Sequence, residues 1–172
     1  MMAKKSLVVL FLVMISLVVV ACSADEAETP QAQMPNPVQE SSAEEIMEEL
    51  GFSLMTPYGA EDIVYSIIDM GDEGKIAQVD FTLDDIGYNY RASAAAEWTD
   101  ISGMYYDWTE EVDTDVSYCS GKTLIADDGD TIVGVILWYD AVPGIQYSLS
   151  MDSDADYTVL WFMAEQLFQP SE

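Results

Sequence analysis

Hydrophobic and polar residues alternate along much of the chain after residue 62, and this alternation predicts β-strands. It is clearest at residues 75–83, where polar side chains separate Ala77, Val79, Phe81 and Leu83. Shorter alternating runs predict further strands at residues 63–69, 88–93, 105–110, 116–119, 122–126, 131–139 and 145–150. Turns that contain glycine, at 71–74 and 84–87, join the first three strands into an expected antiparallel meander.

A short helix is predicted just before the first strand, at residues 43–50. Its hydrophobic residues fall on one face, and Ser41 or Ser42 can cap its first turn in a capping box. Gly51 follows the last turn, where a left-handed residue commonly ends a helix.

A second helical pattern closes the chain, with Ser153 or Asp154 as its expected N-cap. Its expected packing face consists of Tyr157, Leu160, Trp161, Ala164, Leu167 and Phe168. The whole pattern predicts an α+β fold: a curved antiparallel sheet of about six to eight strands, with the short N-terminal helix and with the C-terminal helix packed on one face.

The first residues have the pattern of an export signal. Lys4 and Lys5 precede an almost unbroken apolar run at residues 7–20, which is shorter than the roughly 20 residues of a membrane-spanning helix. The run ends in Val-Val-Ala-Cys at residues 19–22, which resembles the lipobox of bacterial lipoproteins. The resemblance implies cleavage before Cys22 and attachment of a diacylglyceryl group to its thiol. The alternative is an ordinary signal peptide followed by a chance cysteine.

Three segments follow from this interpretation. Residues 1–21 are the expected lipoprotein signal peptide, and residues 22–42 are the lipidated N-terminus with a disordered tether rich in Pro, Glu, Gln, Ser and Ala. Residues 43–170 form a single domain. We therefore expect an exported protein that is anchored to the outer face of the cell membrane through lipid on Cys22.

The net charge of the chain limits the classes of molecule that it can bind. It carries 32 acidic and 5 basic residues, a net charge of −27 at pH 7, and removal of residues 1–21 takes away two lysines but no acid. Such a polyanion repels nucleic acid, so no nucleic-acid partner is expected. It attracts cations and basic proteins, although the same composition also serves to keep an exported protein soluble.

This chain lacks the residues that most enzyme mechanisms require. There is no histidine to activate a serine or cysteine, and Cys119, in a strand-like stretch, is expected to be a small buried residue rather than a nucleophile. A serine activated by Lys75 or Lys122 would have no motif around it. A carboxylate pair that cleaves a sugar bond needs only two of the many acids. We predict no catalytic residues and no cofactor.

Two acidic clusters have the oxygen ligands and short spacing that calcium prefers. They are Asp152-x-Asp154-x-Asp156 and Asp127-Asp128-Gly129-Asp130, and neither follows the EF-hand pattern. The preferred interpretation is a helix N-cap for the first and a hairpin turn for the second, so no metal ligands are predicted.

Aromatic residues crowd the segment from Trp98 to Trp108, which includes Tyr105 and Tyr106. If exposed they would bind glycans or proteins, and if buried they would fill a core, which is the preferred interpretation. Arg91 is the chain's one arginine. We expect it to form a structural ion pair, with a clamp on a carboxylate ligand as the alternative.

Several stretches resemble a family of uncharacterised lipoproteins, mostly from Gram-positive bacteria, that carry a domain of unknown function. These stretches are Leu50-Gly51-Phe52 followed by Pro57, residues 88–93 (YNYRAS), residues 100–105 (DISGMY) and residues 147–150 (YSLS). The resemblance covers most of residues 51–168 and implies an extracytoplasmic setting but no catalytic residues. The surplus acidity and the stretch at 94–98 depart from the family pattern.

The sequence as a whole predicts a membrane-anchored lipoprotein with a non-catalytic domain that interacts with a protein. A domain that binds a small molecule or calcium is the first alternative. A carboxylate-dependent hydrolase is the second.

Overall fold

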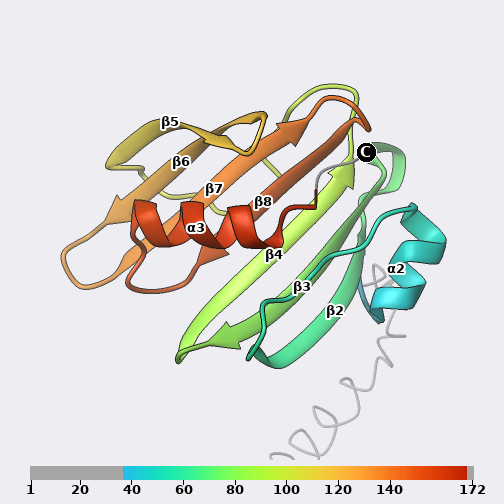
Figure 1. The fold of residues 1–172 in the computed structure, drawn as a ribbon, viewed down its shortest axis with the longest axis horizontal. Helices are drawn as coiled ribbons and strands as arrows, with labels where there is room; N and C mark the ends of the chain where they lie inside the picture. The colour runs from blue at the N-terminus through green and yellow to red at the C-terminus, as the bar shows by residue number, and fades with distance from the viewer. Residues whose placement is uncertain (1–36, 170–172) are drawn as a thin grey trace, which may run out of the picture. The chain divides into compact units, whose positions relative to one another are not determined.

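An eight-stranded antiparallel sheet forms the centre of the fold in the computed structural model, which describes residues 37–169 (Figure 1). The strands in chain order are β1 (Val38–Ser41), β2 (Glu61–Asp69), β3 (Lys75–Leu83), β4 (Ile86–Ala94), β5 (Glu110–Val116), β6 (Cys119–Asp127), β7 (Ile132–Asp140) and β8 (Ile145–Met151). The helices are α2 (Ala43–Leu50), α3 (Tyr157–Leu167) and the short 3₁₀ helix η1 (Gly71–Glu73). The α+β prediction is therefore confirmed.

The sheet is built from two meanders that meet in its middle. Strands run in the order β1-β2-β3-β4-β8-β7-β6-β5, so β4 pairs with β8 and, within each meander, strands that follow one another in the chain are neighbours. Short turns join them, except that residues 42–60, which include α2, connect β1 to β2. The chain that leaves β4 must therefore travel to the far edge of the sheet before it enters β5. Residues 95–109 make this crossing, and we call them the crossing loop.

The two faces of the sheet have different covers. On one face, a buried row runs across the strands through Val79, Tyr90, Leu149 and Ile136, which are paired in register. Helix α3 packs on β5 to β8 of this face and α2 packs beside β2 and β3 (Figure 1). We call it the helix face. The opposite face, which includes the register row Gln78, Arg91, Ser148 and Leu137, is the loop face.

Helix α2 has the predicted bounds and the predicted cap. The Ser42 hydroxyl accepts from the main-chain N–H of Glu45 at 3.2 Å, and the Glu45 carboxylate accepts from the N–H of Ser42 at 3.1 Å. Gly51 ends the helix with φ of 80°, a left-handed conformation that glycine adopts without a Cβ clash. Ile46 on its inner face is fully buried.

Helix α3 begins later than predicted. The N–H of Ala155 still donates to the main-chain oxygen of Ile132 at 3.0 Å, so the chain stays attached to the start of β7 and cannot turn into a helix at Ser153 or Asp154. Asp156 is the N-cap, and its Oδ1 accepts from the N–H groups of Thr158 and Val159.

The packing face of α3 also differs in part from the prediction. Leu160, Ala164 and Leu167 are buried as expected, and Met163 joins them. Tyr157 and Trp161 are 39% and 37% exposed, so the prediction is wrong for these two. The indole N–H of Trp161 donates to the main-chain oxygen of Asp115 at 3.0 Å. Within residues 37–169, no helix combines the length and the apolar character needed to cross a membrane.

Strand β1 lies where the end of a disordered tether was predicted. Residues 38–41 pair with β2, from Val38 opposite Ile68 to Ser41 opposite Tyr65. The prediction is wrong here because an edge strand is held by main-chain hydrogen bonds, and its mostly exposed side chains carry no alternating apolar signal. The ordered domain therefore begins before residue 43. The expected signal peptide, Cys22 and residues 23–36 of the tether lie outside the described residues.

Two further strand predictions are wrong. Residues 105–109 have no strand structure, and β5 begins at Glu110, where the predicted strand was to end. Residues 116–119 hold the tight turn between β5 and β6, in which Ser117 has φ of 56°. The aromatic residues at 105–108 suggested a strand, but they belong to the crossing loop, where side chains rather than main-chain ladders make the contacts.

Candidate functional site

The crossing loop covers part of the loop face and is attached to it at several points. The N–H of Thr99 donates to Gln146 on β8 at 2.8 Å, and the hydroxyl of Tyr139 on β7 donates to the main-chain oxygen of Ala95 at 3.1 Å. Farther along, Met104 and Trp108 pack on a second buried cluster made of Leu124, Val135 and Leu137. Polar and apolar contacts thus hold both ends of the loop on the sheet.

Arg91 is the central attachment of this loop. From β4, its Nη1 donates to the main-chain oxygens of Ile101 and Ser102 at 3.0 and 2.7 Å, and its Nε donates to Gln78 at 2.8 Å. Gly103 passes directly above it with φ of 69°, and a Cβ there would lie 2.7 Å from Nη1.

The predicted ion pair of Arg91 is wrong, since within residues 37–169 it forms no salt bridge. Burial lowers the pKa of Arg91, and the negative charges of Asp80 and Asp100 offset part of that effect. Main-chain carbonyl groups of the crossing loop, rather than a carboxylate, accept the hydrogen bonds of the guanidinium.

A polar network extends from Arg91 along the loop face. The Asp80 carboxylate accepts from Gln78 Nε2 and from Asn89 Nδ2, each at 2.6 Å. Gln78 in turn accepts from Arg91. These contacts fix the side chains of β3 and β4 in one arrangement, so they form a rigid polar floor beside the crossing loop.

A cavity of about 460 Å³ lies over this floor, near the turn between β3 and β4. Asp80, Asn89 and Arg91 line it from the sheet, and Met104 and Tyr106 line it from the crossing loop. A second cavity of about 370 Å³ is lined by acids of the turn between β6 and β7. Tyr106, Val133 and Asp152 line both cavities, which therefore adjoin along these side chains. We call the pair the loop-face groove.

The aromatic residues of the crossing loop divide into inward and outward groups. Trp108 is half-buried on the sheet, which fits the predicted core role. Tyr105 and Tyr106 are 95% and 51% exposed, and Trp98 is 40% exposed, so the preferred core interpretation is wrong for these three. The ring of Tyr106 lies 5.7 Å from that of Trp108, which supports it from below.

The two acidic clusters, at residues 152–156 and 127–130, contain the helix N-cap and the hairpin turn that the sequence analysis preferred to calcium sites. Asp156 caps α3, and Asp128 Oδ1 accepts from the N–H groups of Asp130 and Thr131 in the turn between β6 and β7. The main-chain N–H groups of Thr131 and Asp130 lower the pKa of Asp128. Residues 37–169 contain no group of three or more acidic or cysteine side chains suited to hold a metal ion.

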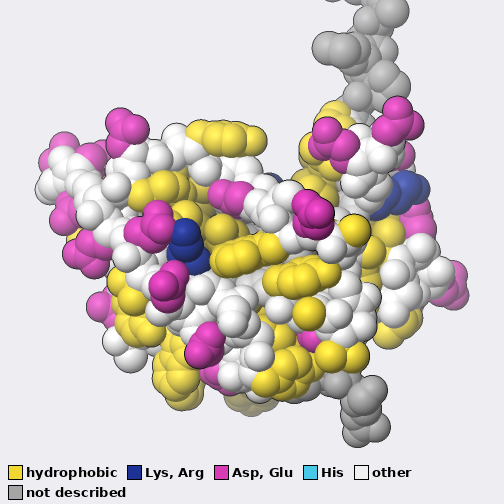
Figure 2. All heavy atoms as spheres, turned by 90° about the horizontal axis from the view of Figure 1, so that it is seen from above, with side chains coloured by type: hydrophobic (Ala, Val, Ile, Leu, Met, Phe, Trp, Pro, Cys, Tyr) yellow, Lys and Arg dark blue, Asp and Glu magenta, His cyan; other side chains and the backbone are white. Residues whose placement is uncertain are grey.

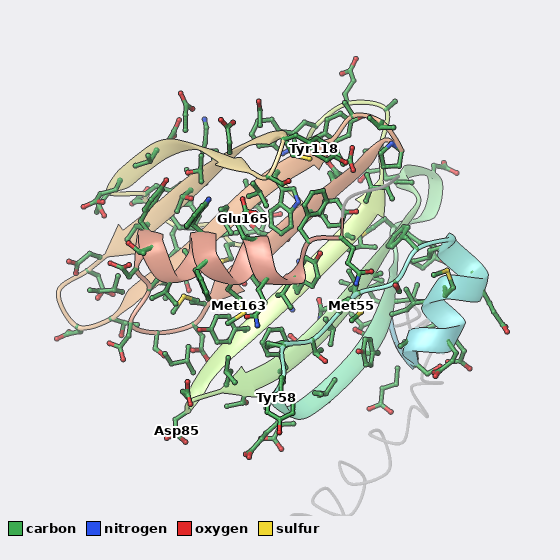
Figure 3. The ribbon with its side chains drawn as sticks, viewed as in Figure 1. Met55, Tyr58, Asp85, Tyr118, Met163 and Glu165 are labelled. Atoms are coloured by element: carbon green, nitrogen blue, oxygen red, sulfur yellow. The ribbon has the colours of Figure 1, made fainter. Side chains whose placement is uncertain are left out.

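Cys119 is buried, as predicted, and only 3% exposed. Burial, with smaller contributions from the negative charges of Asp140 and Glu165, raises the pKa of its thiol to about 12. Glu165 on α3 accepts from the main-chain N–H of Ser117, in the turn that carries Tyr118 (Figure 3). A thiol with so high a pKa is a poor nucleophile at neutral pH.

The two lysines considered as bases for a serine are paired with acids. Lys122 Nζ lies 2.5 Å from Glu111 Oε1, and Lys75 forms the same kind of pair with Glu49. These hydrogen bonds raise the pKa of each lysine. A general base must be neutral near the working pH, and these contacts favour the charged form instead.

Exposed apolar residues also occur on the helix face, which the sequence analysis did not single out. Phe162 and Val159 on α3 are 65% and 40% exposed, and Tyr58 and Met55, between α2 and β2, are 101% and 43% exposed (Figure 3). The composition of α3 could have indicated the exposed residues on this helix, because apolar residues occupy nearly all sides of it and cannot all face the sheet. Figure 2 shows that acidic side chains are spread over the surface seen from above, with hydrophobic ones exposed between them.

Comparison with protein-family models, curated protein sequences and solved structures found no match to this chain. The resemblance to a lipoprotein family stays a prediction.

Proposed function

We propose that this protein is a membrane-anchored, extracytoplasmic lipoprotein whose domain is a non-catalytic protein-interaction module that binds its partner on the loop face. One observation carries the proposal: Tyr105 and Tyr106 are 95% and 51% exposed on a loop that Arg91 attaches to the sheet. Exposed tyrosines are frequent anchors of protein interfaces, where they bury a large area and keep a polar tip.

The attachment of the loop matters as much as its aromatic residues. A mobile loop loses conformational freedom when it binds, and that loss weakens the complex. Here the hydrogen bonds to Ile101 and Ser102, together with the packing of Trp108, already hold the loop on the sheet. The surface is therefore organised before a partner arrives, which favours binding.

Anchoring through Cys22 is the second part of the proposal and rests on the sequence pattern at residues 1–22. It explains how an interaction module would be displayed at the membrane. Mass spectrometry of the mature N-terminus tests it, with a diacylglyceryl-modified Cys22 as the expected first residue. An unmodified Cys22, or a mature chain that begins beyond it, would refute the anchor.

Crosslinking in native membranes tests the interaction surface. The double variant Tyr105→Ser/Tyr106→Ser removes the exposed aromatic rings of the crossing loop, and Phe162→Ser removes an exposed aromatic ring of α3 as the matched control. We expect a partner that wild type and the control capture and the loop variant does not. Capture that depends on Phe162 alone would place the interface on the helix face and contradict the proposal.

A small-molecule site in the loop-face groove is the second candidate, because its larger cavity of about 460 Å³ is within the size range of ligand pockets. Asp80, Asn89 and Arg91 would supply its polar contacts. Thermal unfolding in the presence of a metabolite library distinguishes the candidates. A stabilising compound whose effect is lost in Asn89→Ala would favour this second function.

A further inference from the structure

We propose that the loop-face groove binds an extended segment of a partner protein rich in lysine and arginine, with basic side chains on both sides of Tyr106. This inference rests on the proposed function and specifies the chemistry of its partner. It follows from the shape of the groove, from the signs of the charges around it and from the position of one aromatic ring.

The groove offers a continuous surface rather than two isolated pockets. Tyr106, Val133 and Asp152 are shared by the cavities of about 460 and 370 Å³. Val133 is a buried residue that forms part of its apolar base, and Met104 contributes an apolar wall. An extended chain could lie along this surface and bury the methylene groups of its lysine or arginine side chains there.

The exposed charged side chains around the groove are all acidic. The exposed acids that line it are Asp62, Asp107, Asp127, Asp128 and Asp152. Arg91 is the one basic residue among the described lining residues, and its Nε and Nη1 are occupied by Gln78 and by the crossing loop. The field in the groove therefore attracts a basic segment and repels an acidic one.

The carboxylates of the turn between β6 and β7 remain acceptors for a partner. Asp127 and Asp128 each use Oδ1 for main-chain N–H groups of the turn. Main-chain N–H groups lower the pKa of Asp128, which favours its ionised form. The turn thus holds two negative charges at the edge of the second cavity.

The aromatic ring of Tyr106 distinguishes the groove from a surface that is only acidic. Its ring is 51% exposed, is supported by Trp108, and lines both cavities. A lysine ammonium or an arginine guanidinium over a tyrosine ring gains a cation–π interaction. The ring therefore adds a short-range contact that does not depend on net charge.

A second acidic hollow on the domain supplies the control. A cavity of about 360 Å³ beside α2 is lined by Glu40, Glu45, Glu48 and Glu49 and contains no aromatic residue. General attraction to a polyanion would involve this hollow as much as the loop-face groove. Specific binding would involve the groove alone.

The test uses the full lipidated chain in detergent and a fluorescein-labelled peptide of six arginines, with binding followed by fluorescence anisotropy at low and physiological salt. Asp62→Asn/Asp107→Asn in the groove is compared with Glu40→Gln/Glu48→Gln in the hollow beside α2, called the α2 variant, which changes the net charge by the same amount. We expect the groove variant to weaken binding about three- to tenfold and the α2 variant to change it by less than about twofold. Thermal unfolding confirms that both variants fold.

Tyr106→Ser leaves the charge unchanged and should weaken binding about two- to fivefold. Equal losses in the groove and α2 variants, or no effect of Tyr106→Ser, would show general electrostatic attraction and overturn the inference. Failure of the peptide to bind at low salt would overturn it as well. In that case a partner captured through Tyr105 and Tyr106 would still support the proposed function, so the two failures can be distinguished.

Discussion

Nη1 of Arg91 lies 2.7 Å from the main-chain oxygen of Ser102 and 3.0 Å from that of Ile101. Through these contacts a single side chain of β4 holds the segment that precedes the exposed Tyr105 and Tyr106. The guanidinium is half-buried beneath the loop, so its charge stabilises carbonyl groups that would otherwise lose part of their hydration. Stability of the domain and organisation of the candidate site therefore depend on the same residue.

Replacement of Arg91 by methionine should release the crossing loop. The variant keeps a long side chain but loses three hydrogen bonds, and we expect a loss of about 2–4 kcal/mol in the free energy of unfolding. Hydrogen exchange should become faster at residues 99–105. Lys75→Met removes a positive charge that is exposed and paired with Glu49, and it should leave exchange in the loop unchanged. Unaltered protection of the loop in Arg91→Met would contradict the role assigned to Arg91.

Leu160→Ala should destabilise the domain by about 2–5 kcal/mol, because Leu160 is fully buried between α3 and the sheet. Phe162→Ala is the matched control on the same helix. Phe162 is 65% exposed, and its truncation should change the free energy of unfolding by less than about 1 kcal/mol. Urea unfolding followed by circular dichroism measures both. A large loss in Phe162→Ala would mean that its ring packs against another part of the chain.

Alkylation of Cys119 should be very slow in the folded domain. In a Cys22→Ser variant, Cys119 is the sole thiol, and its pKa of about 12 leaves few thiolates at pH 8. Iodoacetamide should react at a rate on the order of 10²–10³ times lower than in the urea-unfolded chain. Rapid labelling of the folded protein would show that the residue is accessible.

The same thiol makes stability fall at alkaline pH. Its pKa is raised from an ordinary value near 9, so the folded state holds the proton more tightly than the unfolded state. The stabilising effect is complete below pH 9 and is lost as the pH rises toward 12. The stability of Cys119→Ala should therefore decline less steeply in that range than wild type, which chemical denaturation at successive pH values can measure.

Ser42→Ala should lower the free energy of unfolding by about 1 kcal/mol, because it removes the hydroxyl that accepts from the N–H of Glu45. Ser42→Gly should cost only a few tenths of that amount, since glycine is tolerated at an N-cap. Thermal unfolding of the two variants tests this order. The reverse order would show that the serine hydroxyl does not cap α2.

Asp128 should contribute to stability at neutral pH and lose this contribution in acid. Its pKa is lowered in the folded state, so its stabilising effect is present above about pH 4, the usual aspartate value, and disappears as the pH falls through the lowered value. In Asp128→Asn the amide oxygen still accepts from Thr131, but it does not titrate. The variant should show a weaker fall in stability as the pH drops below about 4, which chemical denaturation at successive pH values can measure.

Elements that depend on neighbours in the chain could be predicted from the sequence. The bounds of β3 and α2 were both correct, because alternation, a capping serine and a terminal glycine act within a few residues of one another. The α+β class followed from the order of these patterns. The buried character of Cys119 also followed, since its strand-like setting is a local property.

The candidate site depended on contacts between residues that are distant in the sequence. Alternation cannot show that residues 105–109 belong to a loop that crosses three strands instead of joining the sheet, because aromatic residues are frequent in both situations. The pairing of β1 with β2 likewise uses main-chain groups that every residue has. Only the arrangement of the two meanders brings Tyr106 of the crossing loop beside Val133 of β7 and Asp152 after β8. The sequence determined the elements and their chemistry, whereas tertiary packing decided which side chains share a surface, since this depends on the path of the whole chain.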